Sequence, residues 1–318
     1  MLDFEIRRRK RRIRALAIAC VIVAFLIALT LLYYFIPFER LLPAYAISPR
    51  KEGELRIHFL DVGQGDCTIV EFPDGELLVI DAGDGSWEAN VSVIRYLKGL
   101  NADEPALLIT HADLDHYGGI SQILRCFGAK QLYLPVVSST AAAYTEMLSQ
   151  AEKIGCPTSV MKRYGVISHS SGAYLVCLSP YSQETDENDS SAVLWLDYCG
   201  VSALFSGDVS KAREEKLLEE YRADKDIFNS GEFRVSLSET EILKVAHHGS
   251  ADAVSEEWLN LLHFETAVIS CGADNYYSHP SGEALSALAA ASPGCGIYRT
   301  DELGNIVIAI SDGNYSVL

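Results

Sequence analysis

The pattern of apolar and polar positions divides the chain into two unlike parts. Residues 15–36 form an apolar run without a charged side chain, and a run of this length can cross a bilayer as a helix. From residue 55 onward, short apolar runs alternate with polar loops, as expected for buried strands and amphipathic helices. The sequence therefore predicts a basic segment at 1–14, a membrane anchor at 15–37, a linker at 38–54 and one domain at 55–318.

The order of the elements predicted within the domain indicates its fold class. Strands are predicted at 55–62, 67–72, 77–81, 106–109, 132–134, 174–178, 192–198, 201–205, 241–245 and 267–270, and around Tyr298, Val307 and Tyr315. Helices are predicted at 91–97, 120–127, 141–154, 209–221, 255–262 and 282–291. Mixed strands followed by alternating strands and helices predict an α/β sandwich of two sheets covered by helices.

One polar loop stands out because four metal-binding side chains fall within six residues. His111, Asp113, Asp115 and His116 follow the apolar run 106–109, and open α/β sheets usually bind ligands at the carboxyl ends of their strands. Imidazole nitrogens and carboxylate oxygens are ligands of divalent metals. The loop therefore predicts the core of a metal site, the alternative being a polar turn between strand and helix.

Similar polar side chains follow other predicted strands. They are Gly63, Gln64 and Asp66 in DVGQGD, Asp189 and Ser190 in NDSS, Asp208 in SGD, His247 and His248 in AHHGS, and His279 in HPS. Each motif has a simpler interpretation as a turn or a helix cap. Asp81 is expected to hold loop backbone rather than metal. Parallel strands would gather these loops at one edge, where the ligands suffice for two metals.

Charge limits the location and the partners of the chain. Seven of the first fourteen residues are basic, which places the amino terminus in the cytoplasm and the domain outside. A cleaved signal is the alternative, since Pro43-Ala44-Tyr45-Ala46 contains an A-x-A pattern. Residues 51–318 contain 17 Lys and Arg against 40 Asp and Glu, a charge of −23. This charge argues against a sequence-reading nucleic-acid binder but not against a nuclease.

The cysteines do not predict a disulfide framework. Cys20 lies in the predicted anchor, which leaves an odd number, seven, in the rest of the chain. No CxxC pair is present, which argues against a structural zinc site. Most of the cysteines are expected to be buried free thiols.

Several motifs in register carry a family resemblance. The 111–116 loop, Gly207-Asp208 and His247-His248-Gly249 resemble the metallo-β-lactamase superfamily. More narrowly, DVGQGD at 61–66, THADLDHYGG at 110–119, NDSS at 188–191, SGD at 206–208, KVAHHGS at 244–250, HPS at 279–281 and YRTDELGNI at 298–306 resemble the extracytoplasmic hydrolase domain of ComEC-type competence proteins. The resemblance runs from about residue 55 to residue 310.

The resemblance implies an αβ/βα sandwich with a two-metal hydrolase site. It implies that His111, Asp113 and Asp208 hold one cation, and that Asp115, His116, Asp208 and either His248 or His247 hold the other. The superfamily's usual middle histidine has no clear counterpart here, since His169 has the wrong context, and Asp189 is the suggested substitute. A site richer in oxygen shifts the metal preference from Zn²⁺ toward Mn²⁺ or Mg²⁺.

The resulting hypothesis is a membrane-anchored hydrolase of phosphodiester bonds with two divalent metal ions, Zn²⁺ or Mn²⁺, acting on DNA. Asp115 and Asp208 serve the reaction at the metals, while His279, Ser190 and the backbone from Gly63 to Asp66 hold the substrate. The channel region of ComEC is absent, so DNA import by this chain alone does not follow. Wall-polymer or choline head-group substrates are one alternative, and a catalytically silent binding module is another.

Overall fold

The computed structural model describes residues 2–35, 38–181 and 183–318, which form two compact units, 1–43 and 44–318. The first unit contains α1 (Leu2–Phe35) and the short 3₁₀ helix η1 (Phe38–Leu41). Among the described residues, one helical segment is long and apolar enough to cross a membrane, Arg12–Thr30, with a mean hydropathy of 2.6. Residues 36 and 37, at the end of the predicted anchor, lie outside the described residues.

The second compact unit begins inside the segment predicted to be a linker. Tyr45 donates a backbone hydrogen bond to the Arg95 carbonyl, and its ring packs with that of Tyr96 at a centroid distance of 6.1 Å. The Arg56 guanidinium donates to the carbonyls of Ser48 and Pro49. Residues 44–54 are therefore attached to the domain.

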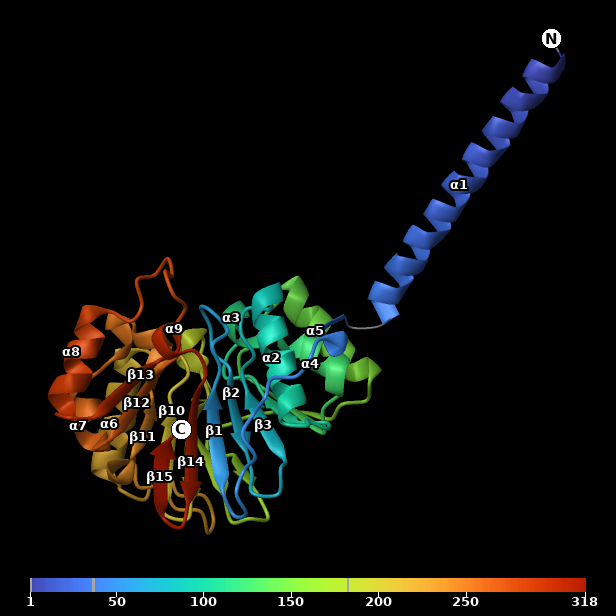
Figure 1. Ribbon diagram of the computed structural model, residues 1–318. Helices are drawn as coiled ribbons and strands as arrows, with labels where there is room; N and C mark the ends of the chain where they lie inside the picture. Colours follow the sequence, from blue (N-terminus) through green and yellow to red (C-terminus); the bar gives the residue numbers. More distant parts are fainter. Residues whose placement is uncertain (1, 36–37, 182) are drawn as a thin grey trace. The chain divides into compact units, whose positions relative to one another are not determined.

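The first sheet has eight strands in the order β15-β14-β1-β2-β3-β4-β5-β6. They are β1 (Leu55–Phe59), β2 (Thr68–Glu71), β3 (Leu77–Ile80), β4 (Ala106–Leu108), β5 (Gln131–Leu134), β6 (Thr158–Val160), β14 (Ile306–Ser311) and β15 (Asn314–Val317). Strands β3 to β6 are mutually parallel. Helices α2 (Trp87–Gly99), α4 (Ile120–Phe127) and α5 (Ala142–Lys153) cover the outer face (Figure 1).

The second sheet has seven strands in the order β13-β12-β11-β10-β9-β8-β7. They are β7 (Val166–Ser168), β8 (Tyr174–Ser179), β9 (Val193–Tyr198), β10 (Val201–Phe205), β11 (Ile242–Lys244), β12 (Thr266–Ile269) and β13 (Gly296–Arg299). Helices α6 (Lys211–Ala223), α7 (Glu256–Leu262) and α8 (Gly282–Ala291) cover its outer face (Figure 1). Short helices α3 (Leu114–Tyr117) and α9 (Thr300–Leu303) and 3₁₀ turns η2 (Asn188–Ser190), η3 (Leu237–Glu239), η4 (Ala246–Gly249) and η5 (Ala251–Ala253) lie in the loops.

Three apolar layers hold these elements together. In β3, Leu78 and Ile80 face the core between the sheets, while Leu77 and Val79 face the helices. Because both faces of the strand are buried, its sequence is continuously apolar rather than alternating. The predicted αβ/βα sandwich with one N-terminal apolar helix is confirmed.

Two strands of the sandwich do not appear among the predicted elements. Strands β6 and β7 have three residues each and lie at the free edges of the two sheets. Thr158, Ser159 and Val160 are all exposed, so this strand lacks the apolar run that marks buried strands.

All eight cysteines are free thiols, as expected from their number and positions.

The strand directions gather several polar loops at one rim of the sandwich. Strand β4 precedes the loop with His111, and β10 precedes the turn with Asp208. The parallel strands β11 and β12 precede His248 and residues 270–281. The predicted gathering of these loops is therefore observed.

Candidate metal centre

Asp81 fixes the backbone of the loop that follows β4. Its carboxylate accepts hydrogen bonds from the Thr110 backbone N–H, at 2.8 Å, and from the Thr110 hydroxyl, at 2.7 Å. It also bonds to the Nδ1 atom of His116 at 2.8 Å. Asp81 itself has a left-handed φ of 58°. The interpretation of Asp81 as a residue that holds loop backbone is confirmed.

Three overlapping groups of possible ligand atoms lie beside this loop, and all three contain His116. His111, His116 and Asp208 offer one nitrogen or oxygen each within 4.8 Å of one another, and all three side chains are buried. Asp115, His116 and His248 form a second group on the same criterion, and Asp66, Asp81 and His116 form a third. The first two groups combine residues from the rim of the sandwich that are up to 137 positions apart, from His111 to His248.

Asp208 lies close to histidines of both the first and the second group. Its Oδ2 atom is 3.3 Å from His116 Nε2, 3.4 Å from His248 Nε2 and 3.8 Å from His247 Nε2. The second oxygen, Oδ1, is buried and has no hydrogen-bond partner. The Nε2 atoms of His111, His116 and His248 are likewise buried without a partner. Unpaired polar atoms in the interior are costly, and their convergence fits a bound cation.

Hydrogen bonds behind two of the histidines orient their rings. His248 Nδ1 donates to the Ser270 carbonyl at 2.9 Å, which requires a proton on that nitrogen. His116 Nδ1 faces Asp81 in the same manner. When each imidazole is neutral, its lone pair therefore lies on Nε2, the atom that faces Asp208. This arrangement is the one that metal-binding histidines commonly adopt.

The electrostatics of the cluster favour positive charge at its centre. Burial opposes ionisation of Asp208, but the charges of His116 and His248 outweigh burial and hold its pKa well below 3.8. Burial also disfavours a charged His248, yet the Asp208 and Asp66 carboxylates raise its pKa to about 10. The cluster therefore binds protons strongly, and divalent cations satisfy the same carboxylates.

Glycines allow the rim loops to approach each other closely. Gly207 has φ of 55°, and a Cβ atom there would lie 2.7 Å from the Ser191 Cβ. Gly65 has φ of 145°, and a Cβ atom there would lie 2.5 Å from the Asp115 carbonyl oxygen. Only glycine fits both the dihedral angle and the space at these positions. Asp208 and Asp115 consequently reach the cluster from tightly packed turns.

Asp113 and the neighbouring Glu187 extend the first ligand group. Asp113 Oδ2 lies 3.6 Å from His111 Nε2, and its side chain is 37% exposed. Glu187 hydrogen-bonds to Asp113, and partial burial together with the Asp113 carboxylate raises the pKa of Glu187. The sequence interpretation missed Glu187, because an acidic residue in a polar loop has no distinguishing pattern.

His247 and His279 lie at the exposed side of the cluster. The ring of His279 is 5.7 Å from that of His247 and 6.4 Å from that of His248, measured between centroids. The His247 side chain remains 31% exposed, whereas His248 is 2% exposed. The geometry therefore favours His248 over His247 as the more deeply placed ligand.

The DVGQGD motif, residues 61–66, contacts the side chain of His248 and the loop that follows β12. Asp66 is buried and pairs with the Nζ atom of the buried Lys244, while its Oδ1 lies 3.4 Å from His248 Nδ1. Gln64 accepts a hydrogen bond from the backbone of Gly272 at 3.2 Å. Gly63 has φ of 75°, a conformation that glycine adopts without strain. The position of Asp66 favours a role in holding the histidines rather than direct contact with substrate.

Lys244 is a further residue that the sequence interpretation missed. It is the only charged residue within β11, Ile242–Lys244, and its side chain is 3% exposed. A charged residue in a short apolar strand is the available signal, since buried lysines need a partner. The pattern alone does not identify that partner, Asp66, 178 positions earlier.

The two residues weighed for the missing middle position do not join the ligand groups. Asp189 accepts a hydrogen bond from the Ser210 backbone at 2.9 Å and lies 3.7 Å from Arg213. His169 stacks on Phe72 and bonds to Asp74 at 3.0 Å, in a separate cluster. Ser190 is buried and donates its hydroxyl proton to the Glu187 carbonyl, so it shapes the turn.

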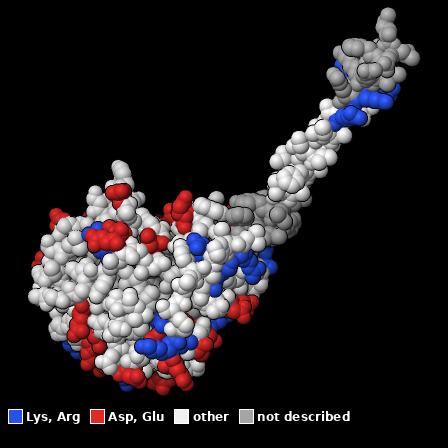
Figure 2. All heavy atoms as spheres, viewed as in Figure 1, with Lys and Arg blue, Asp and Glu red and all other residues white. Residues whose placement is uncertain are grey.

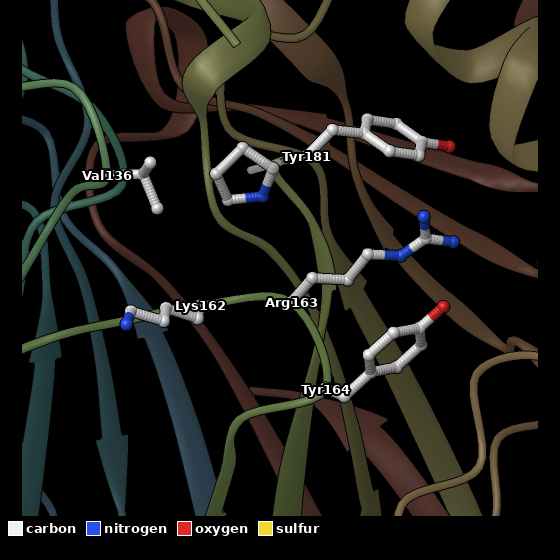
Figure 3. A pocket seen from close by; sticks show the side chains of 6 residues that line it. Val136, Lys162, Arg163, Tyr164 and Tyr181 are labelled. Carbon is white, nitrogen blue, oxygen red and sulfur yellow. The ribbon is translucent and has the colours of Figure 1, made fainter. Parts of the chain in front are cut away.

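A separate cavity of about 530 Å³ lies along the rim, lined by Val136, Lys162, Arg163, Tyr164, Pro180 and Tyr181 (Figure 3). The Arg163 guanidinium lies 4.8 Å from the Tyr164 ring centroid and 4.4 Å from that of Tyr181. Glu220 accepts hydrogen bonds from both Arg163 and Tyr181. The Arg163 cation is therefore already paired and stacked, and none of the residues that line the cavity belongs to the described ligand groups.

The surface carries mixed charge. On the face shown in Figure 2, Lys and Arg side chains lie in separate patches among Asp and Glu. With a charge of −23 over residues 51–318, long-range attraction of a polyanion is not expected. A polyanionic substrate therefore needs short-range interactions close to the ligand cluster.

Comparisons with known proteins agree with this architecture. A family model described as the metallo-beta-lactamase superfamily matches residues 60–273. The chain is 29% identical over 278 residues to ComE operon protein 3 of Bacillus subtilis, covering 82% of this chain and 34% of that protein. It is 27% identical over 230 residues to Recombination protein 2 of Haemophilus influenzae, covering 71% and 25%. The chain thus spans about a third or less of these curated relatives.

A solved structure shows the same fold. A mutant of the CmlA beta-hydroxylase aligns with a TM-score of 0.50 and 12% sequence identity, covering 83% of this chain and 55% of that one. At this identity the similarity concerns the fold alone. The chemistry of the present chain has to be argued from its own side chains.

Proposed function

Because the chain belongs to the metallo-β-lactamase superfamily and carries ComEC-like motifs, we propose that it is a membrane-anchored hydrolase of phosphodiester bonds that uses two divalent metal ions and acts on DNA. The fold is that of a metal-dependent hydrolase. The bond cleaved, the number of metals and the substrate are the proposed elements.

The observation that carries the proposal is the convergence of unpaired ligand atoms. The buried Nε2 atoms of His111, His116 and His248 and the buried Oδ1 of Asp208 have no hydrogen-bond partner. Hydrogen bonds on the far side of His116 and His248 direct these nitrogens to one point. The nitrogens of His116 and His248 lie within ion-pair distance of Asp208 without forming a hydrogen bond to it, whereas a purely structural cluster would close such buried contacts into hydrogen bonds.

We assign the ligands to two sets that share Asp208. His111 and Asp113 would hold one cation, and Asp115, His116 and His248 would hold the other. Divalent cations at such a site lower the pKa of water and stabilise negative charge on phosphate oxygens. Imidazole and carboxylate together suit Zn²⁺ or Mn²⁺.

Residues beside the ligands are proposed to bind and orient the substrate. Asp115 is 35% exposed and lies 3.4 Å from His248 Nε2, so its carboxylate can orient the attacking oxygen. His279 Nδ1 has no hydrogen-bond partner and can donate to a phosphate oxygen. Gly63, Gln64 and Ser190 support the neighbouring turns, and Asp66 with Lys244 keeps the histidines in place.

The proposed location is the cell membrane, with the domain on the extracytoplasmic side. The apolar segment Arg12–Thr30 supports a single membrane span. The basic residues that precede it support an amino terminus in the cytoplasm.

One alternative keeps the chemistry and changes the substrate. The charge of −23 over residues 51–318 favours a less anionic substrate, such as a choline head-group phosphodiester or a wall polymer. A catalytically silent binding module is a second alternative, supported by the placement of Asp189 and His169, which both lie outside the described ligand groups that contain His116.

Turnover assays on the full chain in detergent distinguish these functions. Purified protein is loaded with Zn²⁺ or Mn²⁺ and given bis(p-nitrophenyl) phosphate, single-stranded DNA or p-nitrophenyl phosphorylcholine. The proposal expects metal-dependent hydrolysis of the first two substrates. Hydrolysis of the choline diester alone supports the first alternative, and metal binding without turnover supports the silent module.

A further inference from the structure

The loop between β12 and α8 exposes two adjacent aromatic rings beside the ligand cluster. Tyr276 is 95% exposed and Tyr277 is 64% exposed. In Figure 1 this segment is the orange loop that extends beyond the ends of the strands. Large aromatic side chains with this exposure are informative, because they remove little apolar surface from water within the domain.

The exposed rings continue into the cluster through ring contacts. Tyr276 and Tyr277 meet edge to face at a centroid distance of 5.8 Å. Tyr277 stacks on His279 at 5.7 Å with an interplanar angle of 26°, and His279 stacks on His248 at 6.4 Å and 25°. The four rings therefore form a series from the solvent to a ligand of the proposed metal site.

Hydrogen bonds hold the loop in a defined shape. The Asn275 side-chain amide donates to the carbonyls of Gly272, at 2.9 Å, and His279, at 2.6 Å. Its oxygen accepts from the His279 backbone at 2.9 Å. At the base of the loop, Gly272 donates to Gln64, which ties the loop to the DVGQGD motif. A preorganised loop presents its rings with little further loss of entropy on binding.

We propose that Tyr276 and Tyr277 form a stacking platform for the bases of single-stranded nucleic acid, placed so that a phosphodiester next to the stacked bases reaches the metal centre. This inference rests on the proposed phosphodiesterase function and specifies its substrate class. Stacking on aromatic rings binds bases without regard to their sequence.

The negative charge of the domain explains why binding of a nucleic acid would depend on base stacking. An acidic domain cannot hold a polyanion through a broad basic groove, because long-range repulsion opposes the approach. Base stacking supplies short-range affinity that needs no cationic side chain. Choline also binds aromatic rings, but such sites enclose the cation among several faces. These tyrosines instead project on an exposed loop, which suits a flat base.

A binding experiment tests the platform separately from catalysis. The full chain in detergent, kept metal-free with a chelator, is titrated into a fluorescein-labelled short DNA single strand and into a strand of the same length with abasic sugars. We expect the natural strand to bind about tenfold more tightly or better, as two stacked bases would give. The Tyr276→Ala/Tyr277→Ala variant should lose this preference, and the Tyr276→Phe/Tyr277→Phe variant should keep it.

Activity assays complete the test. With metal, the Ala variant should lose turnover of single-stranded DNA through a higher KM, and this loss should be much larger than any loss with methyl p-nitrophenyl phosphate, which has no base to stack. Equal binding of natural and abasic strands by the wild type overturns the platform. The platform is also overturned if the Ala variant keeps the preference for the natural strand. It is overturned as well if the only turnover that the Ala variant loses is that of p-nitrophenyl phosphorylcholine.

The platform and the phosphodiesterase function can fail independently. If the metal-loaded wild type hydrolyses no phosphodiester but prefers natural strands through the two tyrosines, the platform stands and the proposed function fails. If small diesters are hydrolysed and base preference is absent, the function stands and the platform fails.

Discussion

His116 and Asp81 are joined by a hydrogen bond of 2.8 Å between the imidazole Nδ1 and the carboxylate Oδ2. The same carboxylate binds the Thr110 backbone N–H. One side chain therefore fixes both the path of the ligand loop and the ring orientation of His116, whose Nε2 faces Asp208.

Replacing Asp81 by Asn should weaken metal binding without removing a ligand. The Asn amide can donate to Nδ1 and thereby favour the tautomer with the proton on Nε2. We expect a loss of about 10- to 100-fold in metal affinity, as for other residues behind metal ligands. Isothermal titration of Zn²⁺ into chelator-treated protein measures the change. Asp84→Asn is the control, because the Asp84 carboxylate accepts a hydrogen bond from the Ser86 backbone N–H and belongs to none of the described ligand groups. Equal affinities for the two variants would contradict the role of Asp81.

Removing the charge of Lys244 should destabilise the domain. Lys244 is the buried partner of Asp66, and an unpaired buried carboxylate costs about 3–5 kcal/mol. Thermal unfolding of Lys244→Met should show a clear fall in Tm, and adding Asp66→Asn should restore part of it. Lys153→Met, at an exposed position of α5, should leave the Tm unchanged. A Tm of Lys244→Met equal to that of the wild type would show that the pair contributes nothing.

The buried carboxyl group of Glu214 should lower the stability of the folded domain at neutral pH. Burial raises its pKa well above 4.5, although it accepts a hydrogen bond from the Ser255 backbone. Because the folded state prefers the protonated form, the stability contribution is complete below pH 4.5 and is lost as pH rises through the folded pKa.

The Glu214→Gln variant measures this effect. At pH 8 its Tm should exceed that of the wild type by about 2 °C or more, and the difference should shrink as the pH approaches 4.5. A constant difference across this range would mean that the Glu214 charge is not responsible.

The orientation of the chain can be tested on intact cells. We expect protease added to protoplasts to remove residues 44–318, because the basic residues before the apolar segment favour a cytoplasmic amino terminus. A cytoplasmic protein is the control for intact membranes. Protection of the domain until lysis would place it on the other side.

The sequence predicts the buried helices and strands of this fold better than the short strands at the edges of its sheets. Helices 120–127 and 282–291 and strand 201–205 begin and end where the pattern predicts, because each is bounded by glycine or polar residues and faces a core. Strand β6 forms by pairing with β5 rather than by burying its side chains. Its local sequence therefore carries no signal of the strand.

In the site, too, ligands that share one loop are predictable from the sequence, whereas contacts between residues far apart in the sequence are not. His111 and His116 are identifiable because a single loop contains both. The pairing of Lys244 with Asp66, and of Asp189 with Ser210, depends on how distant turns pack. The family resemblance, which leaves the middle histidine without a counterpart, suggested Asp189 as a substitute ligand, whereas the packing directs its carboxylate to the start of α6.

The central claim is that Asp208 joins two metal sites, and metal content tests it most directly. Elemental analysis of purified Asp208→Ala should show the loss of at least one metal equivalent, and turnover should fall on the order of 10³-fold or more because the shared ligand is gone. His169→Ala is the matched control, since His169 binds Asp74 in a separate cluster, and it should keep both metals and near-normal turnover. If Asp208→Ala retains two metals and normal turnover, or if His169→Ala is the variant that loses metal, the proposed ligand assignment is wrong.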